Sequence, residues 1–342
     1  MTGDNDMIRR ATWAGMAAAV LGVAAFSGIV LAKQDRTDEP HDGIMGEYVG
    51  QWRPADGQKA EAMARVIGEG DGTYRVRLFT SHAWDSKFGE LTGTASAKRV
   101  SLKGTLADAE AEGTLEGGEV LVVKGPKGEF EGKFQVRKPP SLGEKPPEGA
   151  VILLPYKPGT KPSLDAWKNQ KWEVMDDGSA LVQGGGNVSK QAFRSVRLHV
   201  EFRCPYQPKA RGQARGNSGV YLHGKYECQV LDSFGLAGVG NEAGAIYKVA
   251  APTVNPALPP TRWQTYDIWF HAPEVAEDGT VTKPPVFEKV LFNGVVVHEN
   301  AKVTKTTTAG MKGKIREEGP LMLQDHGNAV RYRNIWYVPL EK

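Results

Sequence analysis

Hydrophobic and polar residues alternate along most of this chain with the two-residue period of β-strands. Tyr74, Val76 and Leu78 are a clear example, with polar residues between them. Alternation of this kind is typical of antiparallel strands that have one face in a core and the other in solvent. Similar segments recur between residues 44 and 136, separated by glycines. Residues 44–136 are therefore predicted to form a small antiparallel β domain of unknown role, although 58–67 could instead form one short helix.

A second region of strand-like pattern follows a proline-rich segment. Residues 137–149 are rich in proline and are predicted to be a stiff, extended linker. Residues 150–342 then contain about ten strand candidates and almost no helical pattern. Many short strands in one domain are typical of a two-sheet sandwich or a jelly roll. The predicted fold class is thus all-β, with a smaller β domain before a larger sandwich.

One hairpin of the second region has a clear turn signal. Residues 286–298 are two hydrophobic segments joined by Asn293 and Gly294. Asn-Gly favours the positive φ angles of a two-residue hairpin turn. His298, at the end of this hairpin, is expected to be a surface residue.

Composition and charge agree with this picture and exclude one class of partner. The chain has 342 residues, enough for two domains, with 41 glycines and 21 prolines that suit many turns. The 43 basic and 40 acidic side chains leave a net charge of +3. Such a balance gives no basic surface for nucleic acid. The sequence gives no indication of the oligomeric state.

The N-terminus has the pattern of an export signal. Arg9 and Arg10 precede an uncharged apolar segment, residues 11–32, that ends in a small-x-small cleavage pattern. We expect residues 1–32 to be a signal peptide, residues 33–43 a flexible lead-in, and the protein to be periplasmic or extracellular. The alternative is an uncleaved anchor helix, because about 22 apolar residues can span a bilayer. Only in that case would a membrane be a partner.

The two cysteines leave a choice open. Cys204 and Cys228 can form a disulfide in an exported protein. They can equally be two reduced, buried thiols in neighbouring strands. Spacing along the chain does not decide between these, because a disulfide requires a particular Cα separation.

Polar residues inside one predicted strand point to a binding surface. In residues 226–232, alternation places Glu227 and Gln229 on one face and Cys228 and Val230 on the other. A single Glu-x-Gln pair can simply face solvent. Its carboxylate and amide can equally line a ligand site.

A neighbouring strand repeats the pattern with charged residues. Glu201 and Arg203 flank Phe202 in an otherwise apolar segment. Charged groups on adjacent strands can orient one another and still face a ligand. We expect Glu201, Arg203 and the Glu227 face to line one cleft.

A polar cluster near the C-terminus is expected to join this cleft. Gln324, Asp325 and His326 follow a strand candidate and precede Gly327. If the strand continues through them, Gln324 and His326 share a face and Asp325 points away. Asp325 is therefore the weakest candidate of the three.

Taken together, these motifs resemble the 3-keto-disaccharide hydrolase domain family. The matching segments, in chain order, are 198–203 (LHVEFR), 217–221 (NSGVY), 226–232 (YECQVLD), 244–247 (GAIY), 263–268 (WQTYDI), 291–294 (LFNG), 319–327 (GPLMLQDHG) and 333–335 (RNI). The resemblance covers residues 150–342 and implies a concanavalin-like sandwich that acts on carbohydrate. One departure is a basic insertion, residues 205–215, which can reshape one rim of the cleft.

The resemblance implies a mechanism for these residues. In a 3-keto sugar the C2–H is acidified, so a base can remove it and the C1 oxygen leaves by β-elimination before water adds. The base and acid would be His326 and Glu227, in either order, and Arg203 or Arg333 would stabilise the enolate. The groups that would hold the sugar are Glu201, Asn217, Gln229, Asp232, Tyr247, Gln324 and Arg333.

Three alternatives stay open at this point. Glu201 and Glu227 can be the two carboxylates of a direct glycoside hydrolysis. No cofactor is certain, but His326, Asp325 and Glu227 can hold a divalent metal. Finally, the sandwich can be a non-catalytic carbohydrate-binding module that uses exposed aromatics, for which the candidates are Trp167, Trp172 and Tyr247.

Overall fold

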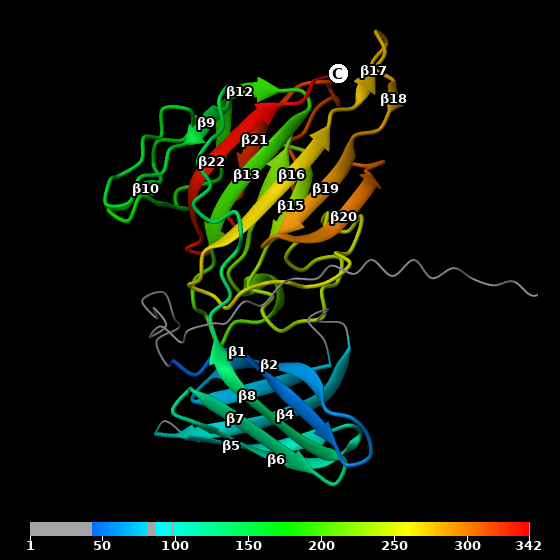
Figure 1. Ribbon diagram of the computed structural model, residues 1–342. Helices are drawn as coiled ribbons and strands as arrows, with labels where there is room; N and C mark the ends of the chain where they lie inside the picture. Colours follow the sequence, from blue (N-terminus) through cyan, green and yellow to red (C-terminus); the bar gives the residue numbers. More distant parts are fainter. Residues whose placement is uncertain (1–42, 81–85, 98, 342) are drawn as a thin grey trace, which may run out of the picture. The chain divides into compact units, whose positions relative to one another are not determined.

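The computed structural model describes residues 43–80, 86–97 and 99–341 (Figure 1). The predicted signal peptide and nearly all of the predicted lead-in lie outside these residues. In the described part of the chain, no helix has both the length and the apolar character needed to cross a membrane. Almost all regular structure is strand, which confirms the predicted all-β class.

The first eight strands close into an antiparallel barrel (Figure 1). They are β1 (Gly46–Pro54), β2 (Ala60–Gly70), β3 (Thr73–Phe79), β4 (Lys87–Ser96), β5 (Arg99–Leu106), β6 (Ala109–Glu116), β7 (Val120–Gly125) and β8 (Gly128–Gln135). Each strand pairs with the next, and β8 pairs with β1, so the sheet has no free edge. The helix considered for residues 58–67 is wrong, because these residues form most of β2.

The barrel interior is a packed core. Tyr74, Val76 and Leu78 are all buried and belong to one hydrophobic cluster, as their alternation predicts. The cluster includes large side chains such as Trp52 and Phe130 from other strands. Side chains that fill a small barrel in this way make it a scaffold.

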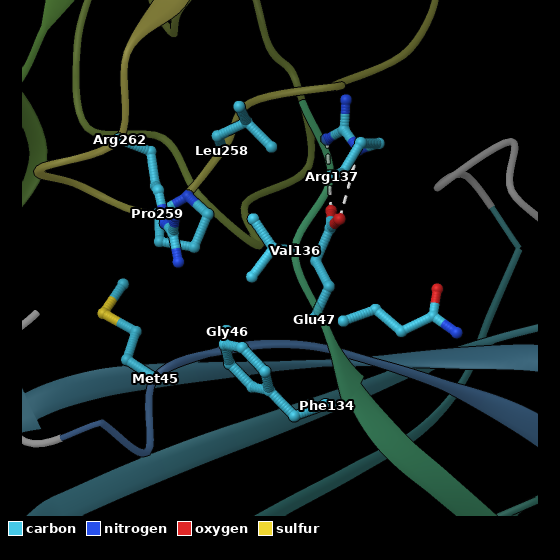
Figure 2. Close-up of a pocket in the computed structure, with 10 residues that line it drawn as sticks. Met45, Gly46, Glu47, Phe134, Val136, Arg137, Leu258, Pro259 and Arg262 are labelled. Atoms are coloured by element: carbon cyan, nitrogen blue, oxygen red, sulfur yellow. Dashed lines mark hydrogen bonds and ion pairs between the residues drawn. The ribbon is translucent and has the colours of Figure 1, made fainter. Parts of the chain in front are cut away.

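A buried charged group lies on the outside of the barrel. Arg65 is fully buried, donates to Glu47 Oε1 over 3.0 Å, and donates to the carbonyl of Asn255 over 2.8 Å. Figure 2 shows Arg137 reaching the same carboxylate, with a distance of 3.1 Å from its Nε to Glu47 Oε2. The adjoining pocket has a volume of only about 10 Å³. That is room for about one water, so this pocket does not hold a sugar.

The remaining strands form a sandwich of two main sheets. The larger sheet contains β10 (Glu173–Val174), β11 (Ala180–Leu181), β22 (Arg331–Pro339), β13 (Val196–Arg203), β16 (Gln264–His271), β19 (Val286–Phe292) and β20 (Val295–Lys302), with β9 (Val151–Leu154) paired to β22. The smaller sheet has the order β12 (Asn187–Phe193), β21 (Gly319–Leu323), β14 (Ser218–Leu222) and β15 (Tyr226–Val230). A separate ribbon consists of β17 (Glu274–Val275) and β18 (Val281–Lys283).

Alternation decides which residues of each sheet enter the shared core. Val200 and Phe202 of β13 belong to the same hydrophobic cluster as Val220, Cys228 and Val230 of the smaller sheet. The outer face of each sheet is thus formed by the residues between these positions. The two sheets therefore present two separate outer faces.

The predicted hairpin at residues 286–298 is present, but its last residue is misplaced. Asn293 and Gly294 both have positive φ, 53° and 81°, and join β19 to β20. His298 is buried, and its Nε2 lies 2.8 Å from the Gly244 carbonyl. The surface position predicted for His298 is wrong, because the loop that contains Gly244 covers it.

The proline-rich segment 137–149 is not a plain extended linker. It contains turns, such as the hydrogen bond from Leu142 N to the Pro139 carbonyl. Ser141 Oγ donates to Asp267 over 2.6 Å, and Gly143 N donates to Glu201 over 2.6 Å. Polar residues between the prolines thus dock the segment on the larger sheet.

The two cysteines are free. Cys204 and Cys228 are both buried and unpaired as a disulfide. Of the two alternatives, the structure has the reduced thiols.

Candidate active site

The outer face of the smaller sheet carries a cluster of polar side chains, which we call the Glu227 cluster. Its members are Asn217, Tyr221, Glu227, Gln229 and Gln324. The register pairs Tyr221 with Glu227 across β14 and β15. Cys228 and Val230 face the core, so the prediction that Glu227 and Gln229 share the opposite face is confirmed.

Glu227 has the electrostatics of an acid–base group. Its side chain is only 2% exposed. Burial raises the pKa of its carboxyl to about 7, and a hydrogen bond from Tyr221 opposes this shift. No ion pair involves Glu227 within the described residues. A carboxyl with a pKa near neutrality can both accept and return a proton.

Tyr221 links Glu227 to the amide of Gln324. The Tyr221 hydroxyl accepts a hydrogen bond from Gln324 Nε2 over 3.0 Å and donates to Glu227. Burial and the nearby Glu227 raise the pKa of Tyr221, so its hydroxyl stays neutral. The three side chains form one chain of donors and acceptors.

Gly219 leaves room for the carboxyl. A Cβ at Gly219 would lie 2.4 Å from Glu227 Oε1 and 2.6 Å from the Tyr221 ring. Both contacts are far below van der Waals distance. The residue beside Glu227 on this face must therefore lack a side chain.

We expect Gly219→Ala to lower activity by about 100-fold, because the methyl group displaces Glu227 from its position and small misplacements of a reacting group are costly. The measurement is kcat/KM for cleavage of the substrate. Gly240→Ala, in an open loop, is the control, because nothing lies within 4 Å of its Cβ position and its φ is not in the positive range. Activity of Gly219→Ala equal to that of the control would contradict the geometry.

Two amide oxygens of the cluster have no partner. Asn217 Oδ1 and Gln324 Oε1 are buried and make no hydrogen bond within the described chain. Buried acceptors are normally satisfied, so these two are available to hydroxyl groups of a ligand. Both residues are among those predicted to bind the sugar.

The basic insertion contributes a further amide. Gln213, in the short 3-10 helix Gly212–Ala214, accepts from Gln229 Nε2 over 3.0 Å. Its backbone carbonyl also accepts from Asn217 Nδ2 over 2.8 Å. The insertion thus fixes two predicted sugar-binding residues from one side.

Tyr247 borders the cluster at the edge of β15. Its backbone N donates to the Glu227 carbonyl over 3.1 Å, and its ring is half-buried beneath the Lys248 ammonium. This places a partly accessible aromatic ring beside the site, where Tyr247 was predicted to bind substrate.

Asp232 has a different role from the one predicted. Its Oδ2 accepts from Arg215 Nε over 2.6 Å, and both side chains are buried. Burial raises the pKa of Asp232, and Arg215 opposes this shift. An acid held by a buried arginine is committed to that pair and is not free for a sugar hydroxyl.

The charged residues of β13 and β22 lie on the other sheet. Glu201 is fully buried on the outer face of the larger sheet, where Arg333 Nε donates to it over 2.7 Å. Arg333 lies against the rings of Tyr156 and Trp263. Arg203 also lies over Trp263 and is 3.6 Å from Asp177.

The expectation that all these residues line one cleft is therefore wrong. Glu201 and Glu227 face away from each other, with both sheets and the core between them. They cannot be the two carboxylates of a direct hydrolysis, which requires both at one bond. For the same reason Arg203 and Arg333 cannot stabilise an enolate formed at Glu227.

The C-terminal polar cluster is also divided. Strand β21 ends at Leu323, so the strand does not continue through His326 as assumed. Asp325 accepts from the backbone N of Gly185 and of Gly327, so it shapes a turn. His326 is exposed, and its predicted role as acid or base stays a prediction.

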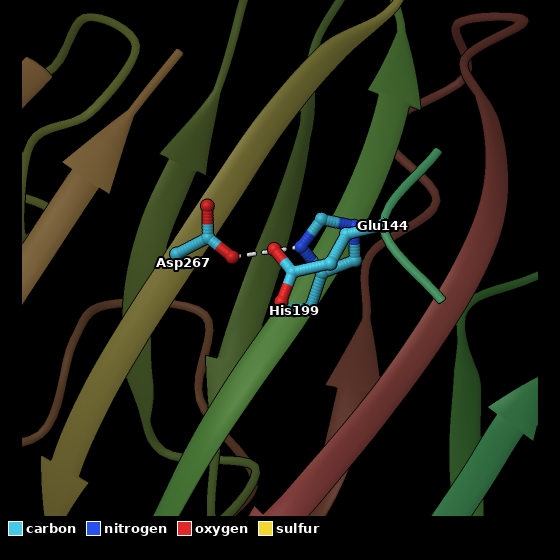
Figure 3. Close-up of side chains that lie close together, drawn as sticks. All are labelled: Glu144, His199 and Asp267. Atoms are coloured by element: carbon cyan, nitrogen blue, oxygen red, sulfur yellow. Dashed lines mark hydrogen bonds and ion pairs between the residues drawn. The ribbon is translucent and has the colours of Figure 1, made fainter. Parts of the chain in front are cut away.

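The proposed metal ligands do not come together. Among the residues described, the group with metal-ligand spacing is Glu144, His199 and Asp267, with ligand atoms within 4.8 Å of one another (Figure 3). This group excludes His326, Asp325 and Glu227. His199 Nδ1 lies 2.7 Å from Asp267, and its Nε2 lies 3.5 Å from Glu201.

The ionisation of His199 argues for an ion network at this place. Burial lowers the pKa of its imidazole, but Asp267 and Glu201 outweigh this and raise it to about 9. A protonated imidazole is a hydrogen-bond donor at both ring nitrogens. Its positive charge balances the carboxylates instead.

This network predicts a pH dependence of stability. A folded-state pKa of about 9, against 6.5 when unfolded, gives stability that is complete below pH 6.5 and is lost as pH rises through 9. We expect a loss of about 3 kcal/mol from this group. Urea unfolding between about pH 6 and 10 checks it, and His199→Gln should remove this fall. An equal fall in the variant would contradict the assignment.

Comparison with known proteins identifies the family to which the sandwich belongs. The model of the family described as the 3-keto-alpha-glucoside-1,2-lyase-like domain matches residues 156–337, more than half of the chain. The chain belongs to this family. The family match includes the whole Glu227 cluster, and it leaves out the barrel.

The chain is also similar to solved structures, and the first of them agrees with the family match. A Parabacteroides distasonis protein described as a "putative glycosyl hydrolase" is 33% identical, with a TM-score of 0.50, over 57% of this chain and 85% of that one. A second protein of that organism, with the same description, is 18% identical, with a TM-score of 0.41, over 57% of this chain and 95% of that one. A comparison with curated proteins gave no match. The family and the first structure support a carbohydrate-active, glycosidase-type enzyme.

Sequence reasoning missed two residues of the site. Tyr221 lies within a motif of the family but was not predicted as a site residue. Alternation with Val220 and Leu222, which face the core, places it on the outer face. Gln213 lies in the insertion, where no periodicity indicates its direction. The position of Tyr221 could have been predicted from the alternation, and that of Gln213 could not.

Proposed function

We propose that the protein cleaves the glycosidic bond of 3-keto-glucosides by elimination across C1 and C2, followed by addition of water. The observation that carries this proposal is Glu227, a buried carboxyl with a pKa of about 7 beside the Tyr221 hydroxyl. Elimination needs one strong proton acceptor, whereas direct hydrolysis needs a second carboxylate on the same face. The family description names a 1,2-lyase, which agrees with this chemistry.

In the proposed first step Glu227 removes the proton from C2. The C–H electron pair forms the enolate with the C3 carbonyl. As Glu227 becomes protonated, the Tyr221 hydroxyl turns from that carboxyl and donates its one proton to a hydrogen bond with the C3 oxygen. Tyr221 suits this role because its raised pKa keeps the proton in place.

In the second step the enolate re-forms the ketone and expels the C1 oxygen. The C1–O bond breaks, a C1–C2 double bond forms, and the leaving oxygen takes a proton. We assign that proton to His326, which follows Gln324 by two residues and is exposed. Water then adds across the double bond. Asn217 Oδ1 and Gln324 Oε1 accept from sugar hydroxyls during both steps.

A binding-only module is the competing function, and one observation disfavours it. Such modules use exposed aromatic side chains. Trp167 and Trp172 are 1% and 4% exposed, and Trp172 stacks on Trp167 and Tyr332 within the core. These two therefore cannot form a binding platform, and of the three aromatic residues considered Tyr247 alone is partly accessible.

The experiment compares a 3-keto-glucoside with the same glucoside before oxidation. Release of aglycone from the keto form alone is the expected result. Binding of both compounds with release from neither would contradict the enzymatic proposal. His326→Ala should slow release if His326 is the acid, and an unchanged rate would remove His326 from the mechanism.

We also propose that residues 1–32 direct export and that the mature protein acts in the periplasm or outside the cell. The basic pair before the apolar segment supports this. Determination of the N-terminus of the protein purified from cells tests it. A start near Lys33 is expected, and an intact Met1 or Met7 would contradict cleavage.

A further inference from the structure

A cationic pocket adjoins the end of the strand that carries Glu227. It lies at the turn between β14 and β15 and has a volume of about 310 Å³. Its lining includes Lys225, Lys312, Lys314, Arg316, His223 and Glu318. The volume is of the size that a sugar ring or a small anionic group occupies.

The charges of this pocket are unbalanced. Four cationic side chains line it against the single carboxylate of Glu318. Lys225 is 7% exposed, and its Nζ donates to the carbonyls of Met311 and Gly313. Among the described residues, Lys312, Lys314 and Arg316 have no carboxylate at ion-pair distance. Clustered cations within a concave site attract an anion.

His223 provides a second, independent sign of a ligand. It is 4% exposed and lines the pocket, and its ring nitrogen Nδ1 makes no hydrogen bond of normal geometry among the described residues, although the Arg316 backbone lies near the ring. Its other nitrogen, Nε2, is 2.9 Å from the Arg194 carbonyl and so carries a proton. A buried polar atom without a partner is unusual, and a ligand would satisfy it.

The pocket is joined to the Glu227 cluster by one residue. Thr307 Oγ1 donates to the Lys225 carbonyl, and Thr307 Oγ1 also accepts from Glu227 N over 3.2 Å. Lys225 lies in the turn directly before β15 and precedes Glu227 by two positions. The pocket and Glu227 are therefore neighbours along the chain.

We propose that the pocket binds an anionic substituent, a carboxylate or sulfate, of the glycoside whose keto sugar lies at Glu227. This inference rests on the proposed function. It assigns the substrate class as acidic glycosides. Lys225, Lys314 and Arg316 supply the attraction, and His223 supplies a directed hydrogen bond.

Calorimetric titration with glucuronate, glucose and inorganic sulfate tests the proposal. Glucuronate should bind at least about tenfold more tightly than glucose, which is about 1.4 kcal/mol. The double variant Lys314→Gln/Arg316→Gln should lose this preference. The control is Lys127→Gln/Lys133→Gln, two exposed barrel lysines, which should keep it.

Three results would overturn the proposal. The first is equal binding of glucuronate and glucose, and the second is an unchanged preference for glucuronate over glucose in the double variant. The third is binding of sulfate with no binding of glucuronate, which would indicate a site for free inorganic anions. Long-range ¹H–¹⁵N spectra should also show a shift of His223 Nδ1 on addition of glucuronate, and an unshifted signal would count against the site.

The test separates this proposal from the proposed function. Binding requires no turnover, so tight glucuronate binding with no aglycone release would disprove only the enzymatic proposal. Release from a neutral 3-keto-glucoside with equal binding of glucuronate and glucose would disprove only the anion pocket.

Discussion

Glu227→Gln is expected to lower kcat/KM for a 3-keto-glucoside by about 10³-fold, within the range measured for loss of a positioned acid–base group. Glutamine keeps the shape and can still accept from Tyr221, but it cannot take the C2 proton. The melting temperature should stay the same or rise, because a buried ionisable group is removed. Aglycone release and thermal unfolding are the two measurements.

Glu299→Gln is the matched control for this prediction. Glu299 is an exposed carboxylate of β20, so its replacement should leave both rate and stability unchanged. Full activity of Glu227→Gln would contradict the assignment. A loss of activity together with unfolding would be a stability effect, and in that case it would not identify a catalytic group.

Glu201→Ala is expected to lower the free energy of unfolding by about 3–5 kcal/mol, the range for breaking a buried ion pair. The substitution leaves Arg333 without its carboxylate, takes one of two carboxylates from protonated His199, and removes the acceptor for Gly143 N. Urea unfolding measures the loss. Activity at low temperature should be retained, because Glu201 lies on the sheet away from Glu227.

Glu131→Ala is the control for this second prediction. Glu131 forms an exposed ion pair with Arg53 at 3.6 Å. Such a pair contributes about 0–1 kcal/mol. A Glu201→Ala protein that is as stable as this control, but inactive, would show that Glu201 belongs to the active site. That result would contradict the placement of Glu201 and Glu227 on the outer faces of different sheets.

The placement of Glu201 and Glu227 on different sheets could not be predicted from the sequence. Alternation correctly gave the face of Glu227 and Gln229 relative to Cys228, because the side-chain period of a strand is fixed. It also placed Glu201 opposite Phe202. It could not assign the two strands to different sheets, because pairing depends on contacts between residues far apart in the chain.

Two other errors have local physical causes. The polar side chain of Asp325 accepts from two backbone N–H groups and ends the strand before His326. Ser141 and Gly143 make the proline-rich segment dock, although its composition is that of a free linker. In both cases a few hydrogen bonds override the preference of the surrounding residues.

The family match narrows the function but leaves the barrel unexplained. It covers residues 156–337 and supports an enzyme that acts on carbohydrate. The barrel has a filled core, and its buried Arg65 forms an ion pair with Glu47 and a hydrogen bond to the Asn255 carbonyl. These features are those of a scaffold attached to the sandwich.

The pH dependence of kcat/KM for aglycone release from a 3-keto-glucoside tests the central claim most directly. If Glu227 is the base, kcat/KM should rise with pH with a midpoint at about 7, where its carboxyl ionises. The same profile in Glu227→Gln should lack this limb. A wild-type profile with no ionisation between about pH 6 and 8, or a variant that keeps it, would contradict the account.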